Sequence, residues 1–82
     1  MTYGKYPTSP PAVGSSVTYV GRYGDTITIT GVEPDRWSVT SSAYIGEILR
    51  DGAMYRTFTQ VGAAKIPTTV PDWTAVMTHV YS

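Results

Sequence analysis

The strongest constraint on the fold is an alternating pattern of apolar and polar residues between positions 15 and 32. Apolar residues occupy every second position, and the residues between them are mostly threonine or serine. A period of two is the spacing of side chains on one face of a β-strand, whereas a helix has a period near 3.6. Gly24 and Asp25 interrupt the pattern, where glycine permits a positive φ and aspartate bonds the neighbouring backbone. The pattern therefore predicts a hairpin with a threonine-rich outer face and a core face of Val17, Tyr19, Ile27 and Ile29.

Two further segments extend the β pattern. Residues 36–40 place Trp37 and Val39 on one face, which predicts a third strand. Residues 43–49 are ambiguous, because their apolar residues are spaced as in one helical turn. Gly46 lies inside this segment and weakens a helix.

Asp51-Gly52 is the strongest hairpin signal in the chain. A two-residue loop at this site pairs Glu47 with Arg56, which places opposite charges across neighbouring strands. This agreement between turn and pairing favours strands on both sides of the loop, the second one over residues 53–61.

The last third of the chain contains a proline-rich segment and another alternating one. Residues 62–71 contain Pro67 and Pro71 and predict a loop. In residues 73–81, threonine and valine alternate, which predicts a last strand, although Asp72 could also cap a helix there. The chain is thus predicted to be all-β: five to six short strands in a small SH3-like barrel or sandwich, forming a single domain over residues 14–82.

The N-terminal residues 1–13 contain three prolines and no apolar periodicity, which predicts an extended arm. Tyr3 and Tyr6 give this arm two large apolar surfaces that could lie on a neighbouring subunit; the alternative is a frayed terminus. The N-terminus lacks the apolar stretch of a signal peptide, and no apolar segment is long enough to span a membrane. We therefore expect a protein made in the cytoplasm, without a signal peptide and without a membrane partner.

Composition excludes several classes of function. Six Lys and Arg balance six Asp and Glu, so the formal net charge is zero, which argues against a basic nucleic-acid-binding face. The absence of cysteine excludes disulfides and thiolate metal sites. Only 15% of the residues are charged, in a chain of 82 residues that can bury only a small core. These features favour a subunit that is completed by an assembly.

No set of residues predicts catalysis, a metal or a cofactor. His79 is the only histidine and has no nucleophile motif near it in the sequence. Four of the six carboxylates stand beside glycine, proline or a break between elements, where turn chemistry accounts for them. We therefore expect a protein that is not an enzyme and has no small-molecule ligand.

The aromatic residues are the candidate contact residues. Nine of the ten are tyrosine or tryptophan, which combine a large apolar area with a polar tip and are common at interfaces. The two tryptophans, Trp37 and Trp73, are predicted to lie in the core rather than on a contact surface. Tyrosines near loops or termini are predicted to bind a partner: Tyr3, Tyr6, Tyr23, Tyr44 and Tyr81.

Residues 14–32, followed by Asp35-Arg-Trp-Ser-Val39, resemble the opening hairpin and next strand of SH3-like small barrels. Such barrels recur in virion proteins of tailed phages. The resemblance implies a barrel of five or six strands that serves as an interaction module, and it carries no catalytic residues.

A second resemblance covers Tyr44-Ile-Gly-Glu-Ile-Leu-Arg-Asp-Gly-Ala-Met-Tyr55-Arg, together with later prolines and Trp73. It is similar to the pattern of small chitin- and cellulose-binding modules, with Glu47 in place of the family's aspartate. This resemblance implies that Tyr44, Tyr55 and Trp73 stack on sugar rings.

Taken together, these patterns predict a non-enzymatic structural protein of a phage virion. Its expected role is capsid decoration or a head/tail accessory subunit, with capsid or tail subunits as partners and further copies of itself as another candidate. The alternative is a carbohydrate-binding module.

Overall fold

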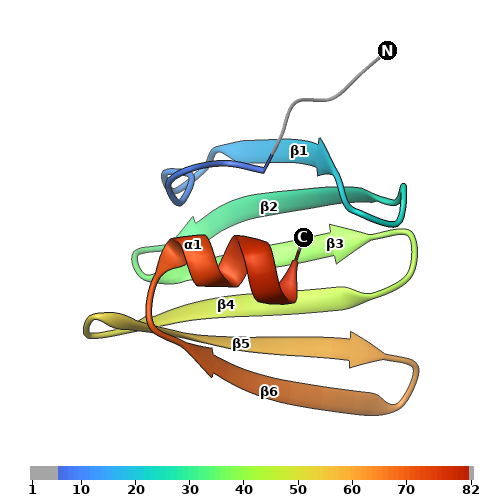
Figure 1. Ribbon diagram of the computed structural model, residues 1–82. Helices are drawn as coiled ribbons and strands as arrows, with labels where there is room; N and C mark the ends of the chain where they lie inside the picture. Colours follow the sequence, from blue (N-terminus) through green and yellow to red (C-terminus); the bar gives the residue numbers. More distant parts are fainter. Residues whose placement is uncertain (1–5, 82) are drawn as a thin grey trace.

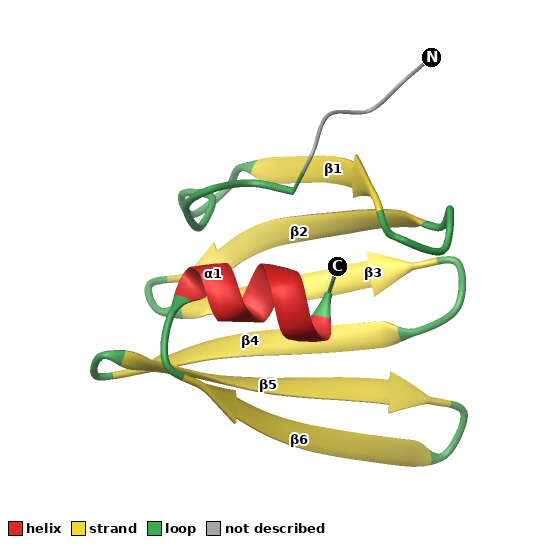
Figure 2. Ribbon diagram, in the orientation of Figure 1, coloured by secondary structure: helices red, strands yellow, loops and turns green. Residues whose placement is uncertain are grey.

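The computed structural model describes residues 6–81 and contains one antiparallel sheet of six strands (Figures 1 and 2). The strands lie side by side in chain order, each joined to the next by a short turn. They are β1 (Ser16–Val20), β2 (Thr26–Glu33), β3 (Arg36–Ser41), β4 (Ile45–Asp51), β5 (Met54–Val61) and β6 (Ala64–Val70). The all-β class and the expectation of five to six short strands are confirmed.

The sheet is open, because β1 and β6 lie at its two opposite edges and are not paired with each other. One face is covered by a short helix, made of α1 (Trp73–Ala75) and a wider π-helical turn, η1 (Val76–Val80). Figure 1 shows this helix lying over the middle of the sheet, in front of β3 and along the direction of the strands. The described part of the chain thus forms two layers, a sheet and a helix, and no element covers the opposite face of the sheet.

The helix corrects the prediction of a last strand over residues 73–81. The Asp72 carboxylate accepts a hydrogen bond of 2.8 Å from the Ala75 N–H and caps the first turn. The residues that face the core, Trp73, Val76, Met77 and Tyr81, are buried at helical spacing. The alternating threonines and valines suggested a strand, but burial of this helical face against the sheet outweighs the β propensity of single residues.

The segment predicted as a loop over residues 62–71 is largely strand β6. Pro67 lies opposite Phe58 in the β5–β6 pair. The two-residue turn pairs Val61 with Ala64, and hydrogen-bonded pairs alternate from there, so the Pro67 nitrogen points away from β5. A proline at that position of an edge strand removes no hydrogen bond from the sheet, which is why β6 tolerates it.

The β4–β5 turn forms one residue later than predicted. Asp51 pairs with Met54, so the loop is Gly52-Ala53, and Gly52 has a φ of 65°. Glycine at the first loop position suits the tight turns that match sheet twist. Consequently Glu47 lies opposite Phe58, and the predicted Glu47–Arg56 pair does not form.

The core lies between the helix and the sheet and contains an aromatic cluster. Trp37, Tyr55 and Trp73 lie with ring centroids 5.7 to 6.0 Å apart. Each tryptophan also donates a hydrogen bond to the N-terminal segment, from Trp37 to the Pro11 carbonyl at 2.8 Å and from Trp73 to the Pro7 carbonyl at 3.0 Å. The two bonds tie that segment to the core of its own chain.

The predicted arm over residues 1–13 is, in its described part, held against the core by these two hydrogen bonds. Tyr6 also packs against the core, and Val13 forms a bridge to Gly31 of β2. Residues 6–13 therefore lie on their own fold, and an extended arm is not confirmed. Tyr3 falls outside the described residues.

Candidate interaction surface

The open face is the surface of the sheet opposite the helix. Strict alternation along each strand places every second side chain on it. From β1 to β6, leaving aside the bulge of β2 after Gly31, these residues are Ser16, Thr18, Val20, Thr26, Thr28, Thr30, Arg36, Ser38, Thr40, Ile45, Glu47, Leu49, Asp51, Met54, Arg56, Phe58, Gln60, Lys65, Pro67 and Thr69. The set divides into a hydroxyl half on β1–β3, which leaves out Arg36 at the start of β3, and a mixed half made of Arg36 and the residues of β4–β6.

The hydroxyl half consists of serines and threonines aligned across the strands. The Ser16 and Thr30 hydroxyls are 2.8 Å apart, and those of Thr18 and Thr28 are 3.0 Å apart. Directly opposite pairs of this kind stabilise a sheet by about 0.2–1 kcal/mol each. The result is a neutral surface whose hydroxyls partly satisfy one another.

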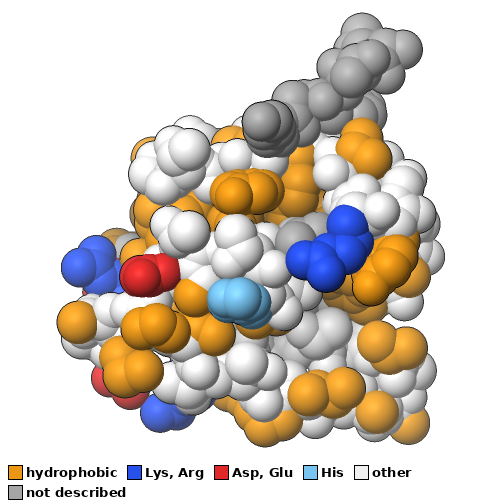
Figure 3. Space-filling model, in the orientation of Figure 1, with side chains coloured by type: hydrophobic (Ala, Val, Ile, Leu, Met, Phe, Trp, Pro, Cys, Tyr) orange, Lys and Arg blue, Asp and Glu red, His pale blue; other side chains and the backbone are white. Residues whose placement is uncertain are grey.

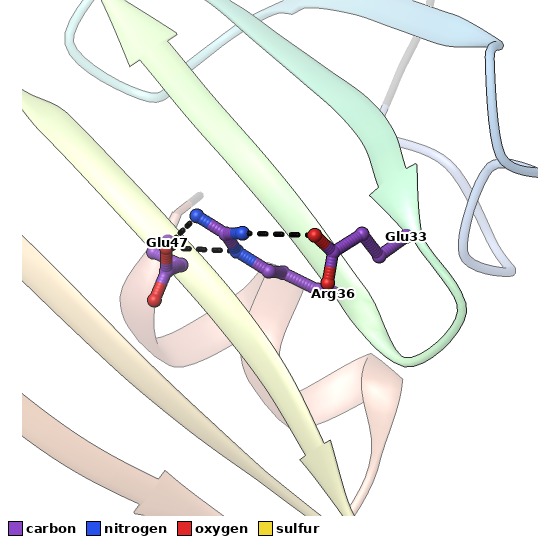
Figure 4. A network of polar contacts seen from close by, with 3 residues as sticks. All are labelled: Glu33, Arg36 and Glu47. Carbon is purple, nitrogen blue, oxygen red and sulfur yellow. Dashed lines mark hydrogen bonds and ion pairs between the residues drawn. The ribbon is translucent and has the colours of Figure 1, made fainter.

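The mixed half begins with an ion-pair network around Arg36 (Figure 4). One oxygen of the Glu47 carboxylate accepts from the Arg36 Nη2 at 2.9 Å and from its Nε at 3.1 Å. The Arg36 Nη1 donates to Glu33 at 3.4 Å. A second ion pair, between Arg56 and Asp51 at 3.2 Å, lies further along the same face. Charges of both signs are thus paired within the chain.

Beside this network lies a shallow hollow of about 250 Å³. Phe58 lines it, and the Lys65 ammonium lies 5.0 Å from the centre of the Phe58 ring. The other lining residues are Ser38, Ile45, Gly46, Glu47 and Gln60. Ile45 is 66% exposed, so the hollow has an apolar rim that an apolar side chain of a protein partner could contact.

The tyrosines predicted to bind a partner occupy different environments. Tyr23 lies in the β1–β2 turn and is 87% exposed. Tyr44 is half-buried and stacks on Tyr81, with ring centroids 5.9 Å apart, and Tyr81 itself is fully buried. Tyr6 packs against the core. Of the four predicted contact tyrosines that the structure describes, Tyr23 alone presents most of its surface to solvent.

The rings proposed for sugar stacking are part of the core or packed on it. Tyr55 and Trp73 are buried and face each other edge to face at 5.7 Å. Tyr44 places one ring face on Tyr81. No common platform of exposed rings is formed by these three residues, so the geometry does not favour carbohydrate binding at this set.

Tyr81 is the centre of a buried polar cluster. Its hydroxyl donates to the Phe58 carbonyl at 3.1 Å and accepts from the Thr59 hydroxyl at 3.4 Å, and its own carbonyl accepts from the Tyr19 hydroxyl. Burial is the main cause that raises the pKa of Tyr19 and of Tyr81 above the usual value near 10. Burial also raises the pKa of Tyr44 to about 12, with the charge of Asp25 as the next contribution.

His79 lies beside a second hollow, of about 320 Å³, at the end of the helix, with Arg22 and Tyr23. The Arg22 guanidinium already donates to the Thr78 carbonyl at 3.1 Å. Within residues 6–81, no group of three or more His, Asp or Glu side chains is placed to hold a metal ion. From the helix side, Figure 3 shows a few scattered charged side chains among hydrophobic and neutral ones.

Comparisons with protein-family models, curated proteins and solved structures find no match to this chain. Among the described residues, no helix is long and apolar enough to cross a membrane.

The residues that give the open face its character were not singled out from the sequence. Phe58 and Ile45 are the clearest examples. Phe58 alternates with Tyr55 and Thr57, which are buried, so the period of two already assigns it to the outer face. The period of two is thus the signal for this face, and it applies to phenylalanine and isoleucine as well as to tyrosine and tryptophan.

Proposed function

We propose that this protein is a non-enzymatic interaction subunit of a larger protein assembly, and that it docks through the open face of its sheet. The observation that carries the proposal is a six-stranded sheet with one face covered by a helix and the other uncovered by any described element. The uncovered face combines exposed apolar side chains with internally paired charges, which is the composition of many protein interfaces.

The size of this face is adequate for a specific complex. Six strands about 4.8 Å apart, each about seven residues long at about 3.4 Å per residue, cover about 700 Å². A standard protein interface buries about 800 Å² on each partner. A partner that covers most of the open face therefore buries an area typical of stable complexes.

The charge pattern favours a protein over a nucleic acid as the partner. Arg36 and Arg56 are both neutralised by carboxylates on the same face. A phosphate backbone would have to displace these carboxylates, whereas a protein surface can pack on the apolar rim around Ile45 without breaking the ion pairs.

The setting we propose is the virion of a tailed phage, with the protein as a capsid decoration or head/tail accessory subunit. The resemblance of residues 14–32 and 35–39 to small barrels of such virions supports this setting. Repeated copies on a lattice would gain strength from multivalency even if each contact were weak.

The test is binding of the purified protein to phage particles that lack it, measured by co-sedimentation. Ile45→Asp places a charge at an exposed position of the open face. Ile66→Asp is the matched control, since Ile66 is 54% exposed but lies on the helix side of the sheet. We expect Ile45→Asp to weaken binding at least about tenfold, by desolvating an unpaired carboxylate, and Ile66→Asp to leave binding unchanged.

Equal losses for the two variants would refute the open face as the docking surface while leaving the virion setting intact. A folded, monomeric wild-type protein with no affinity for particles would refute the virion setting itself.

A further inference from the structure

The two edges of the sheet differ in how well they are protected against pairing with another strand. Edge strands expose unpaired N–H and C=O groups, and proteins commonly block them with proline or lysine. On the β6 edge, Lys65, Pro67 and Thr69 alternate with the residues that are hydrogen-bonded to β5, so their backbone groups point outward. Pro67 has no N–H, and Lys65 adds a charge, so this edge is a poor template for another strand.

Among the residues that the structure describes, the β1 edge has no such protection. The bonds from the Gly21 N–H to the Asp25 carbonyl and from the Gly31 N–H to the Ser15 carbonyl fix the hydrogen-bonding pattern between β1 and β2. This pattern turns the N–H and C=O groups of Ser16, Thr18 and Val20 outward. No backbone hydrogen bond to these groups is found within residues 6–81.

The β1 edge is also regular and uncharged. Its pairing with β2 runs without a bulge from residue 16 to residue 20, and the strand contains neither proline nor an Asp, Glu, Lys, Arg or His side chain. It therefore offers a straight, neutral set of donors and acceptors at a spacing that an antiparallel strand can match.

We propose that the outer edge of β1 pairs with β1 of a second copy of this chain, antiparallel and with the two-fold axis at Thr18. In this register Thr18 faces Thr18 of the partner subunit, and Ser16 faces Val20 of the partner subunit. All three outward residues of each copy then exchange hydrogen bonds in both directions. Any other antiparallel register leaves at least one of the three outward residues, Ser16, Thr18 and Val20, without a hydrogen-bonded partner.

The side chains at the ends of β1 favour a second copy as the partner. Val13, before the strand, is 56% exposed, and Tyr23, after it, is 87% exposed. An antiparallel two-fold arrangement brings the β1–β2 turn of one copy, which carries Tyr23, to the end of β1 at which the other copy turns at Val13 onto β2. Each end of the paired strands thus joins two exposed apolar side chains, and the strands between them carry no charges that would repel.

This pairing extends beyond the docking function proposed above, because it uses the sheet edge and leaves the open face accessible. It would join two sheets into one and make the hydroxyl halves of the two copies continuous. An interface of one five-residue strand with two apolar contacts is small, so the dimer is expected to form reversibly at high protein concentration.

The test is sedimentation equilibrium of the purified chain over a range of concentrations. Thr18→Pro removes an N–H that points outward and takes no part in the bonding to β2. Thr69→Pro is the matched control, since its N–H points outward from the β6 edge. We expect Thr18→Pro to raise the dimer dissociation constant by about tenfold or more, because two reciprocal hydrogen bonds are lost, and Thr69→Pro to leave it unchanged.

A charge pair tests the register without proline. Thr18→Lys alone and Thr18→Asp alone place like charges opposite each other at the two-fold axis and should weaken the dimer, whereas a mixture of the two variants should form a heterodimer. Thr40→Lys, which adds the same charge to the same face on β3, should dimerise as the wild type does.

The proposal is overturned if the wild type remains monomeric at its highest soluble concentration, if Thr69→Pro weakens the dimer as much as Thr18→Pro does, or if the mixture of charged variants shows no heterodimer. Circular dichroism confirms that each variant is folded. None of these measurements depends on phage particles, so their failure and the failure of the docking proposal are distinguishable.

Discussion

Gly46→Ala tests the closest packing contact in the core. A Cβ atom on Gly46 would lie 2.5 Å from the Tyr81 hydroxyl oxygen, 3.1 Å from the Phe58 carbonyl oxygen and 3.1 Å from the Tyr81 ring. The phenol cannot move freely, because it is fully buried and hydrogen-bonded to the Phe58 carbonyl and the Thr59 hydroxyl. Alanine at this position must therefore displace the ring and weaken both bonds.

The loss of stability can be worked out from these contacts. Overpacking costs about 1–3 kcal/mol, and two weakened hydrogen bonds add about 1 kcal/mol each. The lower entropy of unfolded alanine offsets about 0.5–1 kcal/mol. We expect a net loss of about 3 kcal/mol, which is large against the about 4–12 kcal/mol typical of a domain of this size.

The assay is urea denaturation at low protein concentration, followed by the fluorescence of the buried Trp37 and Trp73. Tyr81→Phe should cost about 1–2 kcal/mol, because it leaves the Thr59 hydroxyl without its partner. The double variant lacks the Tyr81 hydroxyl oxygen, which is the atom closest to the new Cβ. Its loss of stability should therefore be smaller than the sum of the two single losses by at least about 1 kcal/mol.

Gly31→Ala provides a matched control for the coupling. A Cβ atom there would meet the backbone of Ala12, which Tyr81→Phe does not relieve. Its loss should add to that of Tyr81→Phe within about 0.5 kcal/mol. Additive losses for Gly46→Ala and Tyr81→Phe as well would refute the contact as the cause.

Three further outcomes are expected. Burial of Tyr44 should not change the pH dependence of stability below about pH 10, where tyrosine begins to ionise in the unfolded chain, and stability should fall as the pH approaches the raised pKa of Tyr44, about 12. The urea midpoint measured as a function of pH checks this, and Tyr44→Phe should reduce the fall. Trp73→Phe should lose about 1–3 kcal/mol in urea denaturation, because the Pro7 carbonyl loses its donor, and speed hydrogen exchange in the N-terminal segment. Arg36→Met should cost less than about 1 kcal/mol, and less still at high salt, because its ion pair with Glu47 is partly exposed.

The hairpin over β1 and β2 was predictable from the sequence because one rule decides it. Apolar residues at every second position must share one face, and Val17 indeed pairs with Ile29, and Tyr19 with Ile27. A shift of one residue would expose all four, so burial fixes the register as well as the strands.

The helix over residues 73–80 could not be derived in the same way. Its residues fit a period of two in Thr74, Val76 and Thr78, and a helical period in Trp73, Val76 and Met77. The choice depends on an apolar sheet face that needs cover, which is a property of the assembled fold and not of the segment. The same applies to β6, since the tolerance of Pro67 depends on which way its nitrogen points at the edge.

The candidate surface was harder to predict than the strands for a related reason. Tyr55 and Phe58 are three residues apart and both aromatic, yet one is buried in the core and the other lines a hollow on the open face. Alternation assigns them to opposite faces, but it does not say which face a helix will cover. That assignment comes from the buried partners of Tyr55, the rings of Trp37 and Trp73.

The two faces of the sheet therefore contribute very different amounts to the free energy of unfolding. This difference makes binding experiments on the open face interpretable. Contacts that hold the fold lie on the helix side, where loss of a buried ring such as that of Trp37 costs about 3–5 kcal/mol. Contacts on the open face are exposed hydroxyl pairs and ion pairs, each worth about 1 kcal/mol or less. A substitution at Ile45 removes almost none of the folding energy, because that side chain is mostly exposed. A loss of binding in such a variant therefore reports a lost contact with a partner rather than a lost fold, whereas the same loss in a Trp37 variant reports unfolding.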